Sequence, residues 1–273
     1  MRNIIKYYYN IDINDIRAED NLYFVDDYIL KEVNNSFDFN LYNYLIMNNV
    51  NVFPIIQNKD GNIFTEIDNK KYILLRNNKI GLCLNFDTIN SFFIPMNIGN
   101  NKDWSLLWQN KIDYFEKTIN KVVDKNILEC FPYYIGMGEL AIRIYRENNS
   151  MTTTGLSHYR LNNEFDFMCP DNIIVDYKVR DIAELLKYKF FNELDFNDII
   201  DSLFKTNLHP GDYIILYARL LFPTYFFDCI EKGGNISKII SKASLYESLL
   251  RRIYFMIKTR VDVPRIDWLI KTA

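Results

Sequence analysis

Glycine is scarce in this chain: there are nine in 273 residues, and none lies between Tyr9 and Val25. Cysteine is scarce as well. The four cysteines stand singly, without a CxxC spacing, which argues against a disulfide framework or a zinc site. The net charge of −3 lacks the basic excess of a dedicated nucleic-acid binder, so we expect no nucleic-acid partner.

Long apolar runs are also missing. The most apolar window, Tyr213–Ile230, is interrupted by Arg219, Pro223 and Asp228. A membrane-spanning helix needs about 20 mostly apolar residues, so this window predicts a buried helix with a kink or break at Pro223 and no membrane span. The first residues have neither an apolar run after the positive charge nor a small-residue cleavage site. They predict cytoplasmic synthesis with no signal peptide.

The first hundred residues read as strands and turns. Ile4–Tyr9 is a β-rich run, and two apolar runs in Leu22–Val33 flank an Asp-Asp turn. Residues Lys59–Asn62 (Lys-Asp-Gly-Asn) predict a hairpin turn between strands rich in Ile and Phe. Leu41–Met47 is a short helix, and Lys71–Arg76 is expected to be the last strand of this part.

The period of the apolar residues changes at Trp104. Trp104, Trp108, Ile112 and Phe115 recur at intervals of three and four, which indicates an amphipathic helix, and helical patterns then continue to Lys258. We therefore predict an α+β, two-lobed, protein-kinase-like fold, with a small antiparallel β lobe followed by a larger helical lobe. The expected divisions are an N-terminal β-rich lobe over 1–84, a loose linker or hinge region over 85–103 and a C-terminal helical lobe over 104–273.

Phosphoryl transfer requires a glycine-rich loop over the phosphates, a strand lysine that pairs with them, and aspartates for the substrate proton and for magnesium. Lys31 ends the strand Tyr28–Leu30 and stands where the nucleotide-binding lysine is expected. Its other interpretation is a solvated lysine at a strand end. The phosphate-covering loop is missing because Tyr9–Val25 has no glycine, and Leu41–Met47 contains no acidic partner for the lysine.

One of the two histidines lies in the segment that would carry catalysis. Aminoglycoside-phosphotransferase-like enzymes have a His-Gly-Asp loop there; here His158 matches the histidine, Tyr159 replaces the glycine and Arg160 stands at the catalytic aspartate. Arginine cannot accept a proton near neutral pH, so this loop is degenerate and we assign no catalytic residue. Downstream, Asp176 matches the metal-binding aspartate and Asp181 matches the aspartate that opens the following helix.

Each of these residues also has a structural interpretation. His158 is expected to be a buried, hydrogen-bonded loop anchor, and Asp181 the N-cap of the following helix. Asp176 either holds a cation or caps the strand-to-helix turn. Arg160 is expected to pair with Asp176 or Asp181. Asp212, after His-Pro-Gly, is expected to be an N-cap.

Several stretches together resemble a known family. They are Lys71–Arg76, Leu107–Asp113, Phe131–Glu139, Leu156–Arg160, Val175–Glu184 and Tyr217–Pro223. In this order they resemble the CotS/YutH-type spore coat proteins of endospore-forming bacteria, a divergent branch of the aminoglycoside-phosphotransferase (kinase-like) superfamily. The resemblance implies a kinase-like fold, a location in the spore coat and other spore coat proteins as partners.

The sequence therefore favours a non-catalytic pseudokinase of the spore coat that acts by protein interaction and needs no cofactor. The alternative is an active ATP-dependent small-molecule phosphotransferase. In that case Lys31 would bind the nucleotide phosphates, Asp176 would hold Mg²⁺, and Asp166 or Asp171 would replace the missing base.

Overall fold

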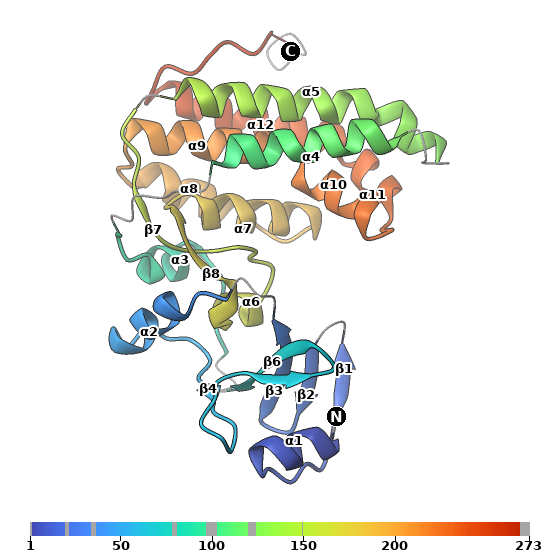
Figure 1. Cartoon of the computed structure of the whole chain (residues 1–273). Coiled ribbons are helices and arrows are strands. Elements are labelled where there is room, and N and C mark those ends of the chain that lie inside the picture. Colours follow the sequence, from blue (N-terminus) through green and yellow to red (C-terminus); the bar gives the residue numbers. More distant parts are fainter. Residues whose placement is uncertain are drawn as a thin grey trace. The chain divides into compact units, whose positions relative to one another are not determined.

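The computed structural model describes residues 2–19, 22–33, 37–77, 81–96, 103–119, 124–148 and 150–267. The chain divides into two compact units, coloured along the sequence in Figure 1. The first comprises residues 1–83 and 163–173, and the second comprises residues 84–162 and 174–273. No sequence pattern indicated that residues 163–173 join the N-terminal unit. Of the segment expected near the hinge, residues 78–80 and 97–102 lie outside the described part.

The first unit is built on an antiparallel sheet of order β1-β2-β3-β6-β4, with β5 also paired to β6. Its elements are α1 (Arg2–Tyr9), β1 (Arg17–Glu19), β2 (Leu22–Val25), β3 (Tyr28–Val33), α2 (Phe39–Met47), β4 (Ile55–Ile56), β5 (Thr65–Ile67), β6 (Lys70–Arg76), α6 (Glu164–Met168) and a 3₁₀ turn, η2 (Pro170–Asn172). The predicted strand pair around the Asp-Asp turn, the helix ending at Met47 and the strand ending at Arg76 are confirmed.

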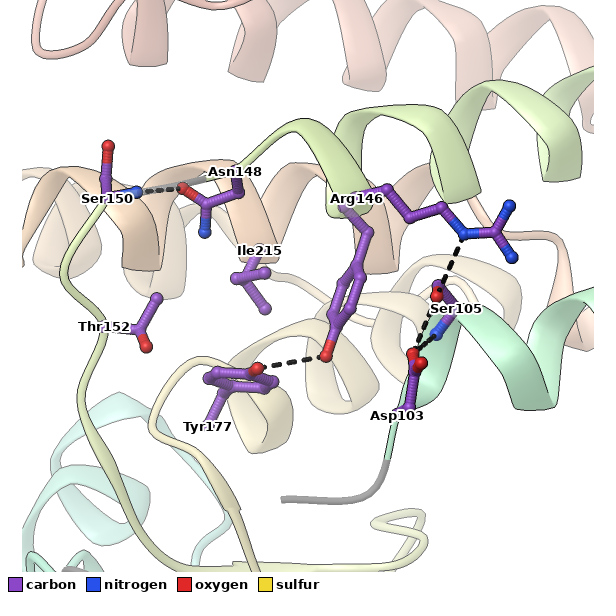
Figure 2. Close-up of a pocket in the computed structure, with 9 residues that line it drawn as sticks. Asp103, Ser105, Arg146, Asn148, Ser150, Thr152, Tyr177 and Ile215 are labelled. Carbon is purple, nitrogen blue, oxygen red and sulfur yellow. Dashed lines mark hydrogen bonds between the residues drawn. The ribbon is translucent and has the colours of Figure 1, made fainter. Parts of the chain in front are cut away.

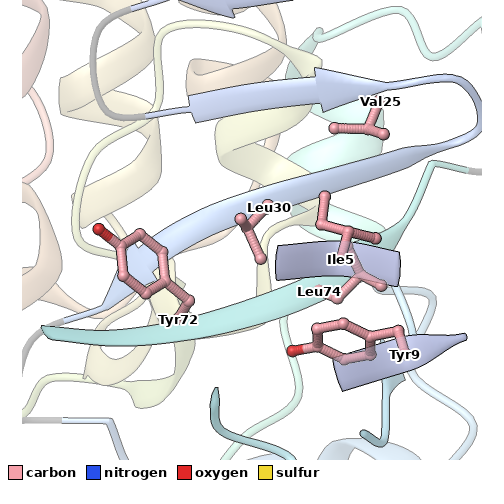
Figure 3. Close-up of a cluster of buried hydrophobic side chains, with 6 residues drawn as sticks. All are labelled: Ile5, Tyr9, Val25, Leu30, Tyr72 and Leu74. Carbon is pink, nitrogen blue, oxygen red and sulfur yellow. The ribbon is translucent and has the colours of Figure 1, made fainter. Parts of the chain in front are cut away.

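The first residues form a helix, α1, and the strand predicted for Ile4–Tyr9 is wrong. Ile5 and Tyr9 lie one helical turn apart, and both are buried against Leu30 and Leu74 of the sheet (Figure 3). Burying an i, i+4 pair on one face favours a helix, which outweighs the β propensity of the isoleucine and tyrosine residues.

The predicted hairpin turn is present, but it joins no hairpin. The side-chain oxygen of Asn58 accepts hydrogen bonds from the backbone N–H groups of Asp60 and Asn62 and so closes this loop. The strands on either side, β4 and β5, each pair with β6 along the same edge. The tight hairpin instead joins β5 to β6 through Asp68 and Asn69, both with positive φ, which these short polar residues tolerate.

The second unit is largely helical. Its elements are α3 (Phe86–Phe92), α4 (Trp104–Thr118), α5 (Lys125–Glu147), β7 (Thr154–His158), β8 (Ile173–Tyr177), α7 (Arg180–Phe191), α8 (Asn197–Lys205), α9 (Pro210–Leu221), α10 (Thr224–Glu231), α11 (Ile236–Ser241) and α12 (Ala243–Lys258). Helix α9 is central: every residue after Pro210 is buried, and it packs against α5, α7 and α12 (Figure 1).

The apolar stretch of this unit breaks at Pro223, as predicted, into α9 and α10. By length and composition alone, Pro210–Glu231 is the one described stretch that qualifies as a membrane span. However, 72% of its most apolar window is buried inside the protein, as in a core helix.

Two local expectations for this unit are wrong. The region expected to be loose contains α3, whose first turn is capped by the side chain of Asn85. Asp212 is not an N-cap, because α9 begins at Pro210 after the N-cap residue His209. Its carboxylate instead accepts hydrogen bonds from the backbone N–H and the hydroxyl of Thr153, at 2.8 and 2.9 Å. Asp212 thus ties α9 to Thr153, the residue directly before β7.

Leu74 tests the core of the first unit, because its side chain is fully buried between the sheet and α1. We expect Leu74→Ala to lower the free energy of unfolding by about 2–5 kcal/mol, through lost burial and the cavity left behind. Chemical denaturation followed by circular dichroism measures this. Met47→Ala is the matched control: Met47 is 81% exposed and should cost less than about 0.5 kcal/mol. Equal effects of the two variants would contradict this description of the core.

Candidate functional site

The histidine of the degenerate loop is a buried anchor, as predicted. His158 ends β7 with no exposed surface, and its ring lies against Phe92. Its Nδ1 is 2.7 Å from one carboxylate oxygen of Asp181, and its backbone N–H donates to the other oxygen at 2.8 Å. The N-cap predicted for Asp181 is wrong, because Val179 is the N-cap of α7 and the carboxylate of Asp181 binds His158 instead.

Asp176, at the end of β8, is bound by two arginines. One of its oxygens accepts a hydrogen bond from Nη1 of Arg180 at 2.9 Å. Both oxygens accept hydrogen bonds from Nη2 of Arg219, at 3.1 and 3.2 Å. All three side chains are almost fully buried. The guanidinium groups of Arg180 and Arg219 lie 4.2 and 4.7 Å from the ring of Trp104. Burial and the neighbouring Arg219 lower the pKa of Arg180 to about 10.

This arrangement bears on the metal role predicted for Asp176. A metal ion there would have to displace two cations that already neutralise the carboxylate. Among the described residues, no group of three or more His, Cys, Asp or Glu side chains is placed to hold a metal. The metal role of Asp176 stays a prediction, and the two guanidinium partners argue against it.

The backbone of the degenerate loop is held by the same arginine. Arg180 donates from Nε to the carbonyl oxygen of His158 and from Nη2 to that of Tyr159, both at 2.7 Å. The Tyr159 ring is 46% exposed. The loop is therefore fixed from inside by a buried cation, while the side chain that replaces the glycine faces outward.

Arg160, at the position of the catalytic aspartate, pairs with carboxylates as predicted, but the predicted partners are wrong. Its Nη2 is 3.1 Å from Asp228 of α10, and its Nη1 is 3.5 Å from Glu184 of α7. Asp176 and Asp181 are engaged elsewhere. Burial lowers the pKa of Arg160, but the two carboxylates outweigh that effect and raise it overall. The residue is a firmly protonated cation that cannot take a proton from a substrate.

The strand lysine lies in the first unit, in a second polar cluster. Lys31 on β3 donates from Nζ to both oxygens of Asp171 at 2.7 Å, and Cys169 Sγ lies 3.5 Å away. The Sγ of Cys169 also contacts Asp171, at 2.7 Å. Desolvation lowers the pKa of Lys31, but Cys169 and Asp171 outweigh it and raise the pKa overall. Asp171, suggested from the sequence as a substitute base, is thus the partner of the strand lysine.

Sequence reasoning missed Lys187 on α7. The side chain is buried, and Nζ donates to the backbone carbonyl oxygen of Phe222 at 2.8 Å. Burial, with Arg219 and Arg160 nearby, lowers its pKa to about 7, although Glu184 and Asp228 act in the opposite direction. The sequence showed only that Lys187 lies in a helix with an amphipathic pattern, and nothing in that pattern indicated a buried amine.

The second unit also has an open polar cavity of about 400 Å³ near the start of α4 and the end of α5 (Figure 2). Its polar groups bond mainly to one another. The hydroxyls of Tyr145 and Tyr177 are 3.0 Å apart, and Ser105 links Arg146 to Asp103. These groups satisfy each other and do not converge on one point, so this cavity is a weak candidate for a specific site.

Comparison with known proteins places the chain in a family. The model of the family described as "spore coat putative kinase YutH" matches residues 6–256. The chain belongs to the YutH spore coat family. Among curated proteins, it is similar to the endospore coat-associated protein YutH of Bacillus subtilis (strain 168), with 26% identity over 206 residues. That match spans 61% of this chain and 61% of the relative. The family resemblance expected from the sequence is confirmed.

Solved structures similar to this YutH family member include phosphotransferases. An aminoglycoside phosphotransferase from Alicyclobacillus acidocaldarius matches with a TM-score of 0.62 at 10% identity, covering 92% of this chain and 94% of that one. A spectinomycin phosphotransferase, solved with ADP and spectinomycin, matches with a TM-score of 0.58 at 14% identity, covering 96% and 93%. At these identities the likeness shows the fold alone, and it confirms the predicted α+β kinase-like class.

The ion pairs of Asp176 predict a large loss of stability when its charge is removed. Asp176→Asn leaves two buried guanidinium groups without their carboxylate, so we expect unfolding to become easier by about 3–5 kcal/mol. Urea denaturation measures the change. Asp198→Asn is the matched control, since Asp198 is half exposed and its 3.7 Å pair with Lys189 should contribute at most about 1 kcal/mol. A loss at Asp176 no larger than that of the control would contradict the role given to this network.

The lowered pKa of Lys187 predicts how stability depends on pH. Between about pH 7 and its unfolded value of 10.5, the unfolded chain holds a proton on this lysine that the folded chain lacks. Folding stability therefore rises with pH in this window, by at most about 1.4 kcal/mol per pH unit. Urea denaturation at several values from pH 7 to 9 should show that Lys187→Met lacks this increase. Parallel stability curves for both proteins would refute the assignment.

Proposed function

We propose that this YutH family member is a non-catalytic, kinase-like protein of the spore coat that acts by binding other coat proteins. The observation that carries the proposal is Arg160. It stands where a phosphotransferase needs a proton acceptor, and its guanidinium group is held by Glu184 and Asp228. A cation held in this way stabilises the loop but cannot act as a base.

The strands that would cover a nucleotide support the same proposal. In the pairing of β1 with β2, Glu19 lies opposite Leu22, so only Asp20 and Asn21 connect them. These two residues lie outside the described part. The sequence from Tyr9 to Val25 contains no glycine, the residue that most readily lets a backbone close over a triphosphate.

The spore coat location rests on family membership and on the curated relative, which is named as endospore coat-associated. Partners from the coat follow from the same relationship. In this role the protein needs neither ATP nor Mg²⁺, and the kinase-like fold serves as a support for contacts with other proteins.

One observation favours the alternative, an ATP-dependent small-molecule phosphotransferase. Lys31 on β3 and Asp171 form a close pair, and Asn172 follows directly. Kinases use a strand lysine for the phosphates and an aspartate with an asparagine for magnesium. In this alternative, Asp171 is a better candidate for the metal than Asp176, because its single cation partner is the lysine that would move to the phosphates.

We expect no phosphoryl transfer and weak or undetectable Mg-ATP binding. Isothermal calorimetry and thermal-shift measurements with Mg-ATP test binding, and a coupled ADP-release assay with aminoglycosides and sugars tests activity. Arg160→Asp should create no activity, because the glycine loop is still absent, while Arg160→Ala should lower the melting temperature by breaking two ion pairs.

The outcome against this proposal is specific. Micromolar Mg-ATP binding that is abolished in Lys31→Ala and Asp171→Ala, but kept in the exposed control Lys70→Ala, would establish nucleotide binding. Turnover that is lost in Asp171→Asn would establish the phosphotransferase. Pull-down of coat proteins by the wild type and equally by Lys31→Ala is the result expected for a binding role independent of nucleotide.

A further inference from the structure

A second, smaller cavity in the helical unit lies between α7 and α10, beside Arg160. Its volume is about 220 Å³. Pockets for drug-sized ligands measure about 300–1,000 Å³, so this one suits a molecule of only a few non-hydrogen atoms. Glu184, Tyr188 and Phe191 line it at intervals of four and three along α7, and so share one face of that helix.

One end of the cavity is aromatic. Phe191 of α7 and Tyr225 of α10 line it with ring centroids 4.1 Å apart, and Tyr188 lies one turn before Phe191. Glu184 is two helical turns from Phe191, about 10 Å along the helix axis, so the charged groups stand at the other end. Aromatic rings offer a large apolar surface, and this end therefore suits a short hydrocarbon chain.

The charged end has one more cation than carboxylates. Arg160 pairs with Glu184 at 3.5 Å and with Asp228 at 3.1 Å. Two carboxylates thus face one arginine, and a protonated Lys187 offsets the second carboxylate. Lys232, at the end of α10, lines the same cavity and forms no ion pair within the described part of the chain. Its charge is the one left over.

The charges behind this wall do not cancel the excess. Asp176 forms a separate set with Arg180 and Arg219, in which two cations face one carboxylate. Lys111 and Glu231 form a pair beside Asp228 and together add no net charge. The charged surroundings of the cavity are therefore positive on balance, and they favour a negatively charged ligand.

The amine of Lys187 has donors to spare. The side chain is 7% exposed, and its one hydrogen bond among the described residues goes to the carbonyl oxygen of Phe222, at 2.8 Å. A protonated amine carries three N–H donors, and leaving a buried donor without an acceptor is costly. A carboxylate in the cavity would supply the missing acceptors.

We propose that this cavity binds the anion of a short-chain carboxylic acid, with the carboxylate held by Lys187 and Lys232 and the hydrocarbon chain against Tyr188, Phe191 and Tyr225. The inference goes beyond the proposed role in the coat and does not depend on it, because it involves no phosphoryl group and no residue of the Lys31 cluster.

Isothermal titration calorimetry with isovalerate, supported by ligand-observed NMR, tests the proposal on the full-length protein. We expect a Kd of about 1 mM or below. Acetate lacks the branched chain and should bind at least about tenfold more weakly, because each buried CH₂ group tightens binding about fourfold. Isobutylamine carries the same chain with a positive charge and should not bind.

Three outcomes with these ligands count against the proposal. No detectable binding of isovalerate at about 10 mM would overturn it, and so would isobutylamine binding as tightly as isovalerate. Acetate binding as tightly as isovalerate would overturn the place given to the hydrocarbon chain.

Two variants locate the carboxylate. Lys187→Met should abolish isovalerate binding, with circular dichroism to check its fold. Lys232→Met should weaken binding only severalfold, because this exposed lysine is screened by solvent. Lys205→Met is the matched control, since Lys205 is an exposed lysine at the end of α8, and it should bind like the wild type. An unchanged affinity in either of the first two variants would refute the contact assigned to that lysine.

The protonation of Lys187 gives a readout that needs no variant. Burial, with Arg219 on α9 and Arg160 after β7, lowers its pKa to about 7, although Glu184 on α7 and Asp228 on α10 act in the opposite direction. Isovalerate remains ionised above pH 7. Its affinity should therefore fall at least about tenfold between about pH 7 and pH 9, as the amine loses its proton. The same affinity at both pH values would overturn the role of Lys187 even if Lys187→Met did not fold.

Discussion

The buried ion pairs of Asp176 are the interaction on which the helical unit depends. One carboxylate on β8 meets Arg180 of α7 and Arg219 of α9, and both guanidinium groups lie on Trp104 of α4. Charges removed from water are tolerated only when each finds its partners, so this contact fixes four elements relative to one another. Arg180 extends the effect to the loop after β7, because it also binds two carbonyl oxygens of that loop. The loop that would carry catalysis is thus held by the protein interior.

A second set of ion pairs holds Arg160. A cation at this position would be unfavourable beside two buried arginines unless carboxylates compensated it. Glu184 and Asp228 do so, and Asp228 also lies 3.7 Å from Lys111 of α4. Arg160 thus has acidic partners from two other helices, α7 and α10.

Local sequence patterns correctly predicted the elements that are determined by neighbouring residues. The strands around the Asp-Asp turn, the strand ending at Arg76 and the break at Pro223 follow from turn residues, alternation and proline chemistry, and all are confirmed. The helix α1 was missed because its apolar pair is meaningful only against the sheet. The partners of charged residues were missed for the same reason. Asp171 lies 140 positions from Lys31 and Arg219 lies 43 from Asp176, and no spacing rule connects residues so far apart.

The lowered pKa of Lys187 is a further consequence of this organisation. The side chain is buried and its amine donates to the backbone carbonyl oxygen of Phe222. Arg219 and Arg160 disfavour a positive charge there, whereas Glu184 and Asp228 favour it, and the loss of water decides the direction of the pKa shift. The buried cations that hold the loop after β7 therefore also influence the protonation of a lysine on α7.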